Sequence, residues 1–290
     1  MAAPPPIRIG SRLFAWGRRT YIMSIINVTP DSFSEPSGRT DPDRAVARAL
    51  LAVAEGADLL DIGGESTRPG AVPVDAATER ARVLPVIEAL VARTDVPLSI
   101  DTTKASVAEA ALRAGCALVN DVSGLHADPE MAGVVTRFGV PLVAMANLRG
   151  IHFDDVIAGV GARFSASLAI AAAAGIARER VILDPGFGFG PAPAQNLEMV
   201  RRLGELHAFG RPLLLGVSRK STLGRVLDLP VEQRLEGTAA AVTLGIAAGV
   251  AIVRVHDTRA IGRVARMADA IVRGWVPPAD ATQARQTGTS

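Results

Sequence analysis

Polar side chains that could hold a charged ligand stand directly after short apolar runs of this sequence. Asp184 follows the apolar residues 181–183, and three glycines lie within 186–190. A run this short is typical of a strand buried on both faces, and a carboxylate at its end needs a partner or a ligand. The glycines allow a ligand close to the backbone, and Phe187 and Phe189 offer apolar ring faces. The stretch therefore indicates a binding site at the end of a strand.

The same arrangement of an apolar run with a polar end recurs along the chain. Because the carboxyl ends of parallel strands meet on one face of a barrel, we expect these ends to converge. No Cys/His metal cluster and no Ser-His-Asp order stands out, and His126, His152 and His207 are interpreted as ordinary surface or satisfied residues. The residues at the ends are Asn27, 65–68, Asp101, Asn120, Asp121, Met145, Asp184, 218–220, Arg254 and His256.

Four of these residues predict a site for a flat heterocycle. Carboxylates such as Asp101 and Asp184 can accept two N–H groups from an aminopyrimidinone edge. The amide of Asn120 can donate and accept, and the ammonium of Lys220 can donate to a ring carbonyl. Lys220 and Lys104 are the only lysines of this arginine-rich chain, which suggests that a compact ammonium is needed there. As the alternative, each aspartate could cap the helix that follows its strand.

A second group predicts an anion site. Asn27, Arg254, His256 and the loop with Ser66 and Thr67 suit a phosphate or diphosphate held in part by backbone amides. Arg254 stands within an apolar strand, where a buried guanidinium needs an anion.

The elements that must position these residues alternate between strand and helix. Eight such units favour an α/β fold with a (β/α)8 TIM barrel; an open doubly wound sheet would need a glycine-rich loop after the first strand, which 27–30 is not. Two short runs around Gly10 and Ser11 predict an N-terminal β-hairpin that caps one end of the core. Strands are expected at 20–26, 59–62, 98–101, 118–121, 141–145, 181–184, 213–217 and 252–255, and helices at 41–56, 75–94, 105–115, 129–138, 155–174, 196–209, 232–248 and 258–273.

Composition bounds the class of protein. The chain has 290 residues, is 49% hydrophobic and carries a net charge of +2 without a run of like charges, which disfavours nucleic-acid binding. The single Cys116 fits a reducing compartment. The start lacks the pattern of a secretory signal, and the apolar segment 166–176 is too short to span a bilayer. We expect a cytoplasmic protein without a membrane partner, with an N-terminal segment 1–19, one domain over 20–275 and a flexible tail at 276–290.

Seven blocks of the sequence stand in an order that is specific as a set. On them the chain resembles the dihydropteroate synthase family over nearly its whole length. The blocks are 27–34 (Asn-Val-Thr-Pro-Asp-Ser-Phe-Ser), 63–70 (Gly-Gly-Glu-Ser-Thr-Arg-Pro-Gly), Asp101-Thr102, 120–124 (Asn-Asp-Val-Ser-Gly), 184–190 (Asp-Pro-Gly-Phe-Gly-Phe-Gly), 216–221 (Gly-Val-Ser-Arg-Lys-Ser) and 254–257 (Arg-Val-His-Asp).

The resemblance implies a TIM-barrel transferase of folate biosynthesis. Such an enzyme joins p-aminobenzoate to 7,8-dihydropterin-6-ylmethyl diphosphate and releases diphosphate, and the family also implies a homodimer. The pterin would be held by Asp101, Asn120, Asp184 and Lys220, with Met145 against the ring.

The resemblance also implies roles around the other substrate groups. Phe189, Lys220 and Ser221 would line the p-aminobenzoate pocket. Thr67, Arg68 and Pro69 would lie in a mobile loop that closes over this substrate together with the loop 28–39. Asn27 would ligate Mg²⁺ on the diphosphate, and Arg254 and His256 would bind the diphosphate oxygens. Lys220, Arg254 and His256 are therefore the catalytic candidates.

Three departures from the family pattern leave alternatives open. Ala146-Asn147 replaces His-Met after Met145, Glu35-Pro36 replaces Asp-Gly, and Pro191 replaces a lysine. None removes a main ligand, but a catalytically weak or inactive paralogue is one alternative. A pterin-binding methyltransferase is another, although it would not need the diphosphate clasp at 254–256. A non-catalytic pterin-binding or partner-subunit protein is the third.

Overall fold

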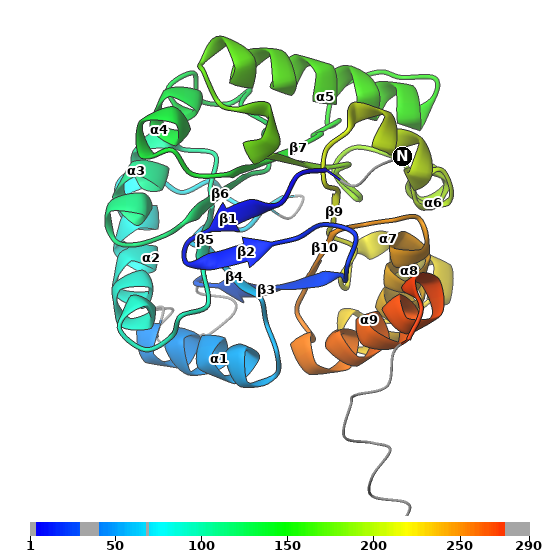
Figure 1. The fold of residues 1–290 in the computed structure, drawn as a ribbon, viewed down its shortest axis with the longest axis horizontal. Coiled ribbons are helices and arrows are strands. Elements are labelled where there is room, and N and C mark those ends of the chain that lie inside the picture. Colours follow the sequence, from blue (N-terminus) through cyan, green and yellow to red (C-terminus); the bar gives the residue numbers. More distant parts are fainter. Residues whose placement is uncertain (1–3, 30–40, 68–69, 276–290) are drawn as a thin grey trace, which may run out of the picture.

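The computed structural model describes residues 4–29, 41–67 and 70–275. Within these residues, eight parallel strands form one sheet with helices around it (Figure 1). Two further strands, β1 (Ile7–Ile9) and β2 (Arg12–Phe14), form an antiparallel hairpin. The predicted TIM barrel with an N-terminal hairpin is confirmed. The parallel strands are β3 (Tyr21–Asn27), β4 (Leu59–Gly63), β5 (Leu98–Asp101), β6 (Leu118–Asp121), β7 (Leu142–Met145), β8 (Val181–Asp184), β9 (Leu214–Leu215) and β10 (Ile252–Val255).

The strand order follows the chain around the barrel. It runs β8-β7-β6-β5-β4-β3-β10-β9, and an isolated parallel bridge between Leu183 and Leu213 joins its two ends. Each strand is short and buried on both faces, as parallel strands covered by helices must be. All carboxyl ends therefore open on the same face of the molecule.

Helices connect the strands and bury an apolar stripe against them. Asp41, Asp75 and Asp155 each accept a hydrogen bond from a backbone N–H of the first turn of α1, α2 and α5, which satisfies donors that a helix start leaves unpaired. The helices are α1 (Pro42–Ala54), α2 (Ala76–Val91), α3 (Ala105–Arg113), α4 (Met131–Phe138), α5 (Val156–Ala173), α6 (Pro193–Arg201), α7 (Ser221–Leu227), α8 (Leu235–Ala247) and α9 (Thr258–Arg273).

Two elements differ from the prediction. The helix expected at 196–209 is α6 followed by a 3-10 helix, η3 (Leu203–Phe209), because the backbone leaves helical geometry at Arg202 (φ −104°, ψ 12°) and Gly204 adds little helix propensity. The strand expected at 213–217 pairs with β10 only through Leu214 and Leu215. Beyond them the chain turns at Gly216 into the site described below.

The hairpin closes the amino-terminal end of the barrel, as predicted, and lies across the strands in Figure 1. Phe14, Trp16 and Tyr21 contact one another there, with ring centroids 4.6 to 5.9 Å apart. These rings belong to a buried cluster that includes Leu59 and Leu118 of the barrel interior. The other end of the barrel is left for the polar residues.

Helix α5 is longer than the apolar segment 166–176 suggested. By length and composition alone it could cross a membrane. Val160 and Phe164 are nevertheless fully buried in the main hydrophobic core, and the helix packs against β7 and η3. It is one of the helices that cover the barrel.

Candidate active site

The strand register brings the predicted residues to one level at the carboxyl end of the barrel. Asn27 of β3 stands opposite Gly63 of β4, and Gly63 opposite Asp101 of β5. Asp101 in turn stands opposite Asn120 of β6. On the far side of the barrel Met145 of β7 pairs with Asp184 of β8. Residues separated by up to 157 positions in the sequence thus share one rim.

Arg254 holds this rim together from inside the barrel. Its Nε donates to Asp61 Oδ2 at 2.6 Å, and its Nη2 donates to Asp101 Oδ2 at 2.6 Å. Asn120 Nδ2 donates to the same Asp61 oxygen at 2.9 Å. The expectation that Arg254 needs an anion is met by two carboxylates of the chain itself.

Asp61 is a site residue that the sequence analysis missed. It lies in the middle of β4 rather than at its end, and its side chain is fully buried. A signal was present in the sequence, since a carboxylate inside an apolar strand needs a cationic partner just as Arg254 needs an anionic one.

Burial sets the protonation of this group. Burial raises the pKa of Asp101 from 3.8 to about 7, while Arg254 opposes the shift. Burial lowers the pKa of Arg254, but Asp61 and Asp101 raise it above its usual value overall. Among the described residues, Oδ1 of Asp61 and Oδ1 of Asp101 have no hydrogen-bond partner. A ligand that brings N–H donors to this wall would satisfy buried acceptors that are otherwise costly.

A second charged pair faces this wall across Gly216. A Cβ at Gly216 would lie 3.8 Å from Asp184 Oδ2, 3.9 Å from Lys220 Nζ and 3.9 Å from Arg254 Cβ. The absence of a side chain there keeps a space between the three groups. Burial raises the pKa of Asp184, and Lys220 opposes that shift. Burial also lowers the pKa of Lys220 to about 8 although Asp184 favours its charged form.

The glycine-rich turn after β8 supports Lys220. The lysine Nζ donates to the carbonyl oxygen of Phe187 and lies 4.5 Å from the ring centroid of Phe189. Gly186 has φ +75°, and a Cβ there would come within 2.1 Å of Ala146 O, so only glycine fits. Phe189 lines the cleft described next, whereas Phe187 is fully buried in the main hydrophobic core.

A cleft of about 240 Å³ opens beside Asp101. Arg149 links two of its walls, because its guanidinium donates to Thr67 O at 2.9 Å and lies 4.5 Å from the Phe189 ring centroid. Arg149 was missed, since nothing in the sequence separates it from the many other arginines. The cleft is lined by Glu65, Ser66, Thr67, Ala71, Pro73, Glu79, Asp101, Thr102, Thr103, Val122, Asn147, Arg149 and Phe189.

The remaining predicted residues lie around the same end of the barrel. His256 follows β10, and its Nδ1 lies 3.0 Å from Ser218 Oγ. Ser221 is exposed at the first turn of α7, and Asn27 is half-buried at the end of β3. Arg68 lies outside the described residues.

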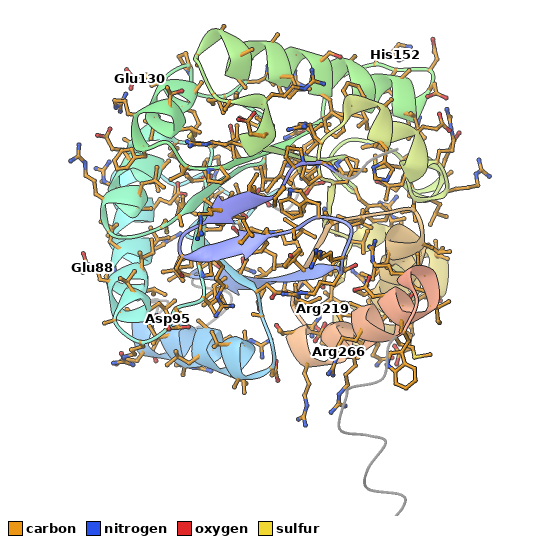
Figure 2. The ribbon with its side chains drawn as sticks, viewed as in Figure 1. Glu88, Asp95, Glu130, His152, Arg219 and Arg266 are labelled. Carbon is orange, nitrogen blue, oxygen red and sulfur yellow. The ribbon has the colours of Figure 1, made fainter. Side chains whose placement is uncertain are left out.

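The positions of the other histidines and of the two aspartates decide two further points: whether these histidines belong to the site, and whether the aspartates cap helices. His152 lies at the periphery (Figure 2) and is almost fully exposed. His207 Nε2 contacts the carbonyl oxygen of Ala248 at 2.7 Å, and His126 Nε2 lies 3.3 Å from Ser167 Oγ. Neither Asp101 nor Asp184 caps a helix, since Lys104 and Ala192 hold those positions. The alternative of a helix cap therefore does not hold for either aspartate: Asp101 accepts from Arg254, and Asp184 Oδ1 accepts from Gly186 N at 2.8 Å.

Comparison with known proteins agrees with this geometry. The family described as "Pterin binding enzyme" matches residues 23–256. The dihydropteroate synthase of Clostridium beijerinckii is 44% identical over 268 residues, which cover 92% of this chain and 100% of that protein. The enzyme of Bacillus subtilis is 44% identical over 258 residues, with 89% and 90% covered.

Solved structures give the same result. The Clostridium difficile dihydropteroate synthase, crystallised in the presence of pteroic acid, is 48% identical with a TM-score of 0.86, and 90% of this chain and 99% of that one are covered. The Xanthomonas albilineans enzyme in complex with 7,8-dihydropteroate is 39% identical with a TM-score of 0.85, with 94% and 100% covered.

Proposed function

This chain belongs to the pterin-binding enzyme family, and from that premise we propose that it is a dihydropteroate synthase. As a transferase it condenses 7,8-dihydropterin-6-ylmethyl diphosphate with p-aminobenzoate and releases diphosphate. One observation carries the proposal: Asp184 and Lys220 lie beside the space that Gly216 leaves open, together with Arg254, which holds the carboxylates of Asp61 and Asp101. A flat ring that carries N–H donors next to a carbonyl on one edge suits a carboxylate beside an ammonium.

The pterin would lie between these walls. Asp101 offers the partnerless Oδ1, and Asn120 is already oriented by Asp61. Asp184 would accept the N–H groups of the aminopyrimidinone edge, and Lys220 would donate to its carbonyl. Met145, fully buried at the end of β7, is placed to pack against the ring. A ring without these groups would leave buried charges unpaired, which is the source of selectivity.

The arylamine would bind in the adjoining cleft. Phe189 separates that cleft from Lys220, and Thr67 and Arg149 border it. Arg149 is a further candidate for the p-aminobenzoate carboxylate, because it lines the cleft and no carboxylate offsets the lowering of its pKa by burial. Arg68 and Ser221 keep their predicted roles in this pocket.

The reaction needs charge stabilisation more than proton transfer. The leaving diphosphate gains negative charge as its bond to the pterin methylene breaks, and fixed cations near it lower the barrier. Two guanidinium nitrogens of Arg254 hold carboxylates, which leaves one nitrogen for a diphosphate oxygen, and His256 would supply a second donor. The aniline nitrogen is nucleophilic near neutral pH, so no general base is required.

We propose Mg²⁺ as the cofactor. The described residues contain no group of three or more His, Cys, Asp or Glu that could hold a metal ion, so the ion would be bound mainly by diphosphate oxygens, as Mg²⁺ often is. The half-buried amide of Asn27 at the rim fits the one protein ligand that this requires. When bound, the ion would neutralise the leaving group.

The apolar surface of the last two helices supports a homodimer. Leu244 of α8 and Met267 and Ile271 of α9 are exposed, as is Trp275 just beyond, and α8 packs beside α9. Exposed apolar side chains gathered on neighbouring helices favour a protein partner. We also propose that the protein acts in the cytoplasm, since its single Cys116 is a free buried thiol, as is usual in a reducing compartment.

A coupled assay of diphosphate release tests the function. Release is expected only when both p-aminobenzoate and the pterin diphosphate are present, and a Lys220→Ala variant should lose it. Ala146 stands where the family pattern has a histidine, but its backbone N–H still donates to Asp184 O at 2.8 Å. We therefore expect the wild-type enzyme to catalyse the reaction. Pterin binding without diphosphate release would point instead to an inactive paralogue. Transfer of a methyl group from a methylated tetrahydrofolate would indicate a methyltransferase.

A further inference from the structure

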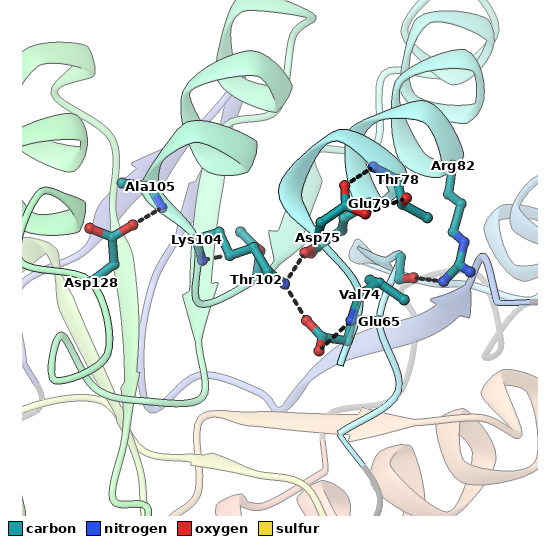
Figure 3. A network of polar contacts seen from close by, with 11 residues as sticks. Glu65, Val74, Asp75, Thr78, Glu79, Arg82, Thr102, Lys104, Ala105 and Asp128 are labelled. Carbon is teal, nitrogen blue, oxygen red and sulfur yellow. Dashed lines mark hydrogen bonds and ion pairs between the residues drawn. The ribbon is translucent and has the colours of Figure 1, made fainter. Parts of the chain in front are cut away.

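Lys104 lies outside the roles described so far, although it is one of two lysines in the chain. Its ammonium donates to Glu79 Oε2 at 2.6 Å and to Glu65 Oε2. Figure 3 shows the three side chains pointing toward one another from three separate elements. Glu79 comes from α2, Lys104 precedes α3, and Glu65 follows β4.

The buried carboxylate makes this contact obligatory. The side chain of Glu79 is fully buried, and among the described residues its Oε1 has no partner. Burial alone would lower the pKa of Lys104, but hydrogen bonds to Glu65 and Glu79 raise it above the usual value. The ammonium therefore stays charged and fixes both carboxylates, and a compact ammonium fits between them better than a fork of five donors.

Glu65 connects Lys104 to the loop that borders the cleft. Its Oε1 accepts from Val74 N at 3.3 Å, so one carboxylate joins both ends of the segment 65–74. Arg82 NH1 donates to Gly64 O at 2.8 Å just before it. A Cβ at Gly64 would meet Val83 Cγ1 at 2.8 Å, so the glycine lets the segment start close against α2. Ser66 and Thr67 follow directly and line the cleft.

We propose that Lys104, Glu65 and Glu79 form a positioning clasp that sets the arylamine side of the cleft without touching the pterin. The proposal rests on the dihydropteroate synthase function. Lys104 is a positioning residue, since it acts through Glu65 on Ser66 and Thr67. Asp101, which is proposed to bind the pterin, is held instead by Arg254 and by the pairing of β5 with β6.

Three variants test the clasp. Glu65→Gln removes one charge but keeps the buried Lys104–Glu79 pair, so the protein should fold. Lys104→Met removes the cation, and Lys104→Arg restores a charge that can bridge two carboxylates. The matched control is Arg113→Met, which breaks an exposed ion pair with Glu109 at 2.7 Å on the same helix, α3.

The expected result is a change for one substrate only. In Glu65→Gln and Lys104→Met the KM for p-aminobenzoate should rise about tenfold or more, because small misplacements of a binding loop are costly. The Kd for the pterin diphosphate, measured by calorimetry, should stay within about twofold. Lys104→Arg, which keeps the charge but not the compact ammonium, should recover only part of the loss. Arg113→Met should match the wild type in both.

An independent readout does not depend on turnover. Hydrogen exchange at the Val74 amide should speed up in Lys104→Met relative to wild type and Arg113→Met, because Glu65 loses its anchor. An unchanged KM for p-aminobenzoate, an equal loss of affinity for both substrates, or unchanged Val74 exchange would each overturn the clasp. Absence of diphosphate release by the wild type would refute the proposed function instead, and the exchange would still test the clasp.

Discussion

Replacing Arg254 by methionine should produce a pH-dependent loss of stability. The substitution leaves Asp61 and Asp101, each 2.6 Å from a guanidinium nitrogen in the wild type, as uncompensated carboxylates. Breaking a buried ion pair costs about 3–5 kcal/mol, which is a large share of the roughly 5–15 kcal/mol that stabilises a folded domain. Urea unfolding, followed by circular dichroism, would measure the difference in free energy of unfolding.

The sign of the pH dependence follows from Asp101. Burial raises its pKa from 3.8 to about 7, so the folded state binds this proton more tightly and stability falls as pH rises between those values. Arg254 is the main influence that lowers this pKa, and its removal moves proton loss above pH 7. The deficit of Arg254→Met should therefore be largest at pH 8 and smaller at pH 5, where the carboxyl is protonated in the folded variant.

Two controls decide whether the reasoning holds. Arg113→Met, which breaks a pair on the exposed face of α3, should cost no more than about 1 kcal/mol at either pH. Adding Asp61→Asn to Arg254→Met should recover part of the loss, because one buried charge is removed. A deficit in Arg254→Met as small as that of Arg113→Met, or one equal at pH 5 and pH 8, would refute this account of the rim.

Three further predictions follow from single contacts. Lys220→Met should weaken pterin binding at pH 7 by about tenfold or more, and wild-type affinity in calorimetry should fall as pH rises through the lysine pKa of about 8, a fall that the variant should lack. Gly186→Ala should cost well over 1 kcal/mol of stability in thermal unfolding, because its Cβ would lie 2.1 Å from Ala146 O. The control Gly150→Ala has a similar φ but open space around it, so it measures the backbone strain alone. Equal losses of stability in the two variants would contradict the clash. Met267→Glu should convert the proposed dimer into a monomer in light scattering, and exposed Met267 would have no such role if the mass were unchanged.

The alternation of apolar runs and helical stretches was enough to predict the barrel, because buried parallel strands need apolar side chains on both faces. The polar ends of those strands were enough to locate Asp101, Asn120 and Asp184. Asp61 was missed because it stands inside its strand, where its partners Arg254 and Asn120 lie 193 and 59 positions away.

Contacts between distant segments could not be derived from the sequence. Arg149 is indistinguishable in sequence from surface arginines, and only the fold brings it over Phe189. Lys104 was noticeable as a rare lysine, but its two carboxylate partners lie on separate elements. Arg202, where α6 gives way to η3, pairs with Asp155 from another part of the chain, a contact that local helix propensity does not reveal.

A crystal structure with bound 7,8-dihydropterin-6-ylmethyl diphosphate would test the central claim most directly. The ring should lie over Gly216, with N–H donors on Asp101 Oδ1 and Asp184 and its carbonyl within hydrogen-bond distance of Lys220 Nζ. The diphosphate should point toward Arg254, His256 and Asn27. A ring bound elsewhere, or one that leaves both Asp101 and Asp184 without a contact, would contradict the account.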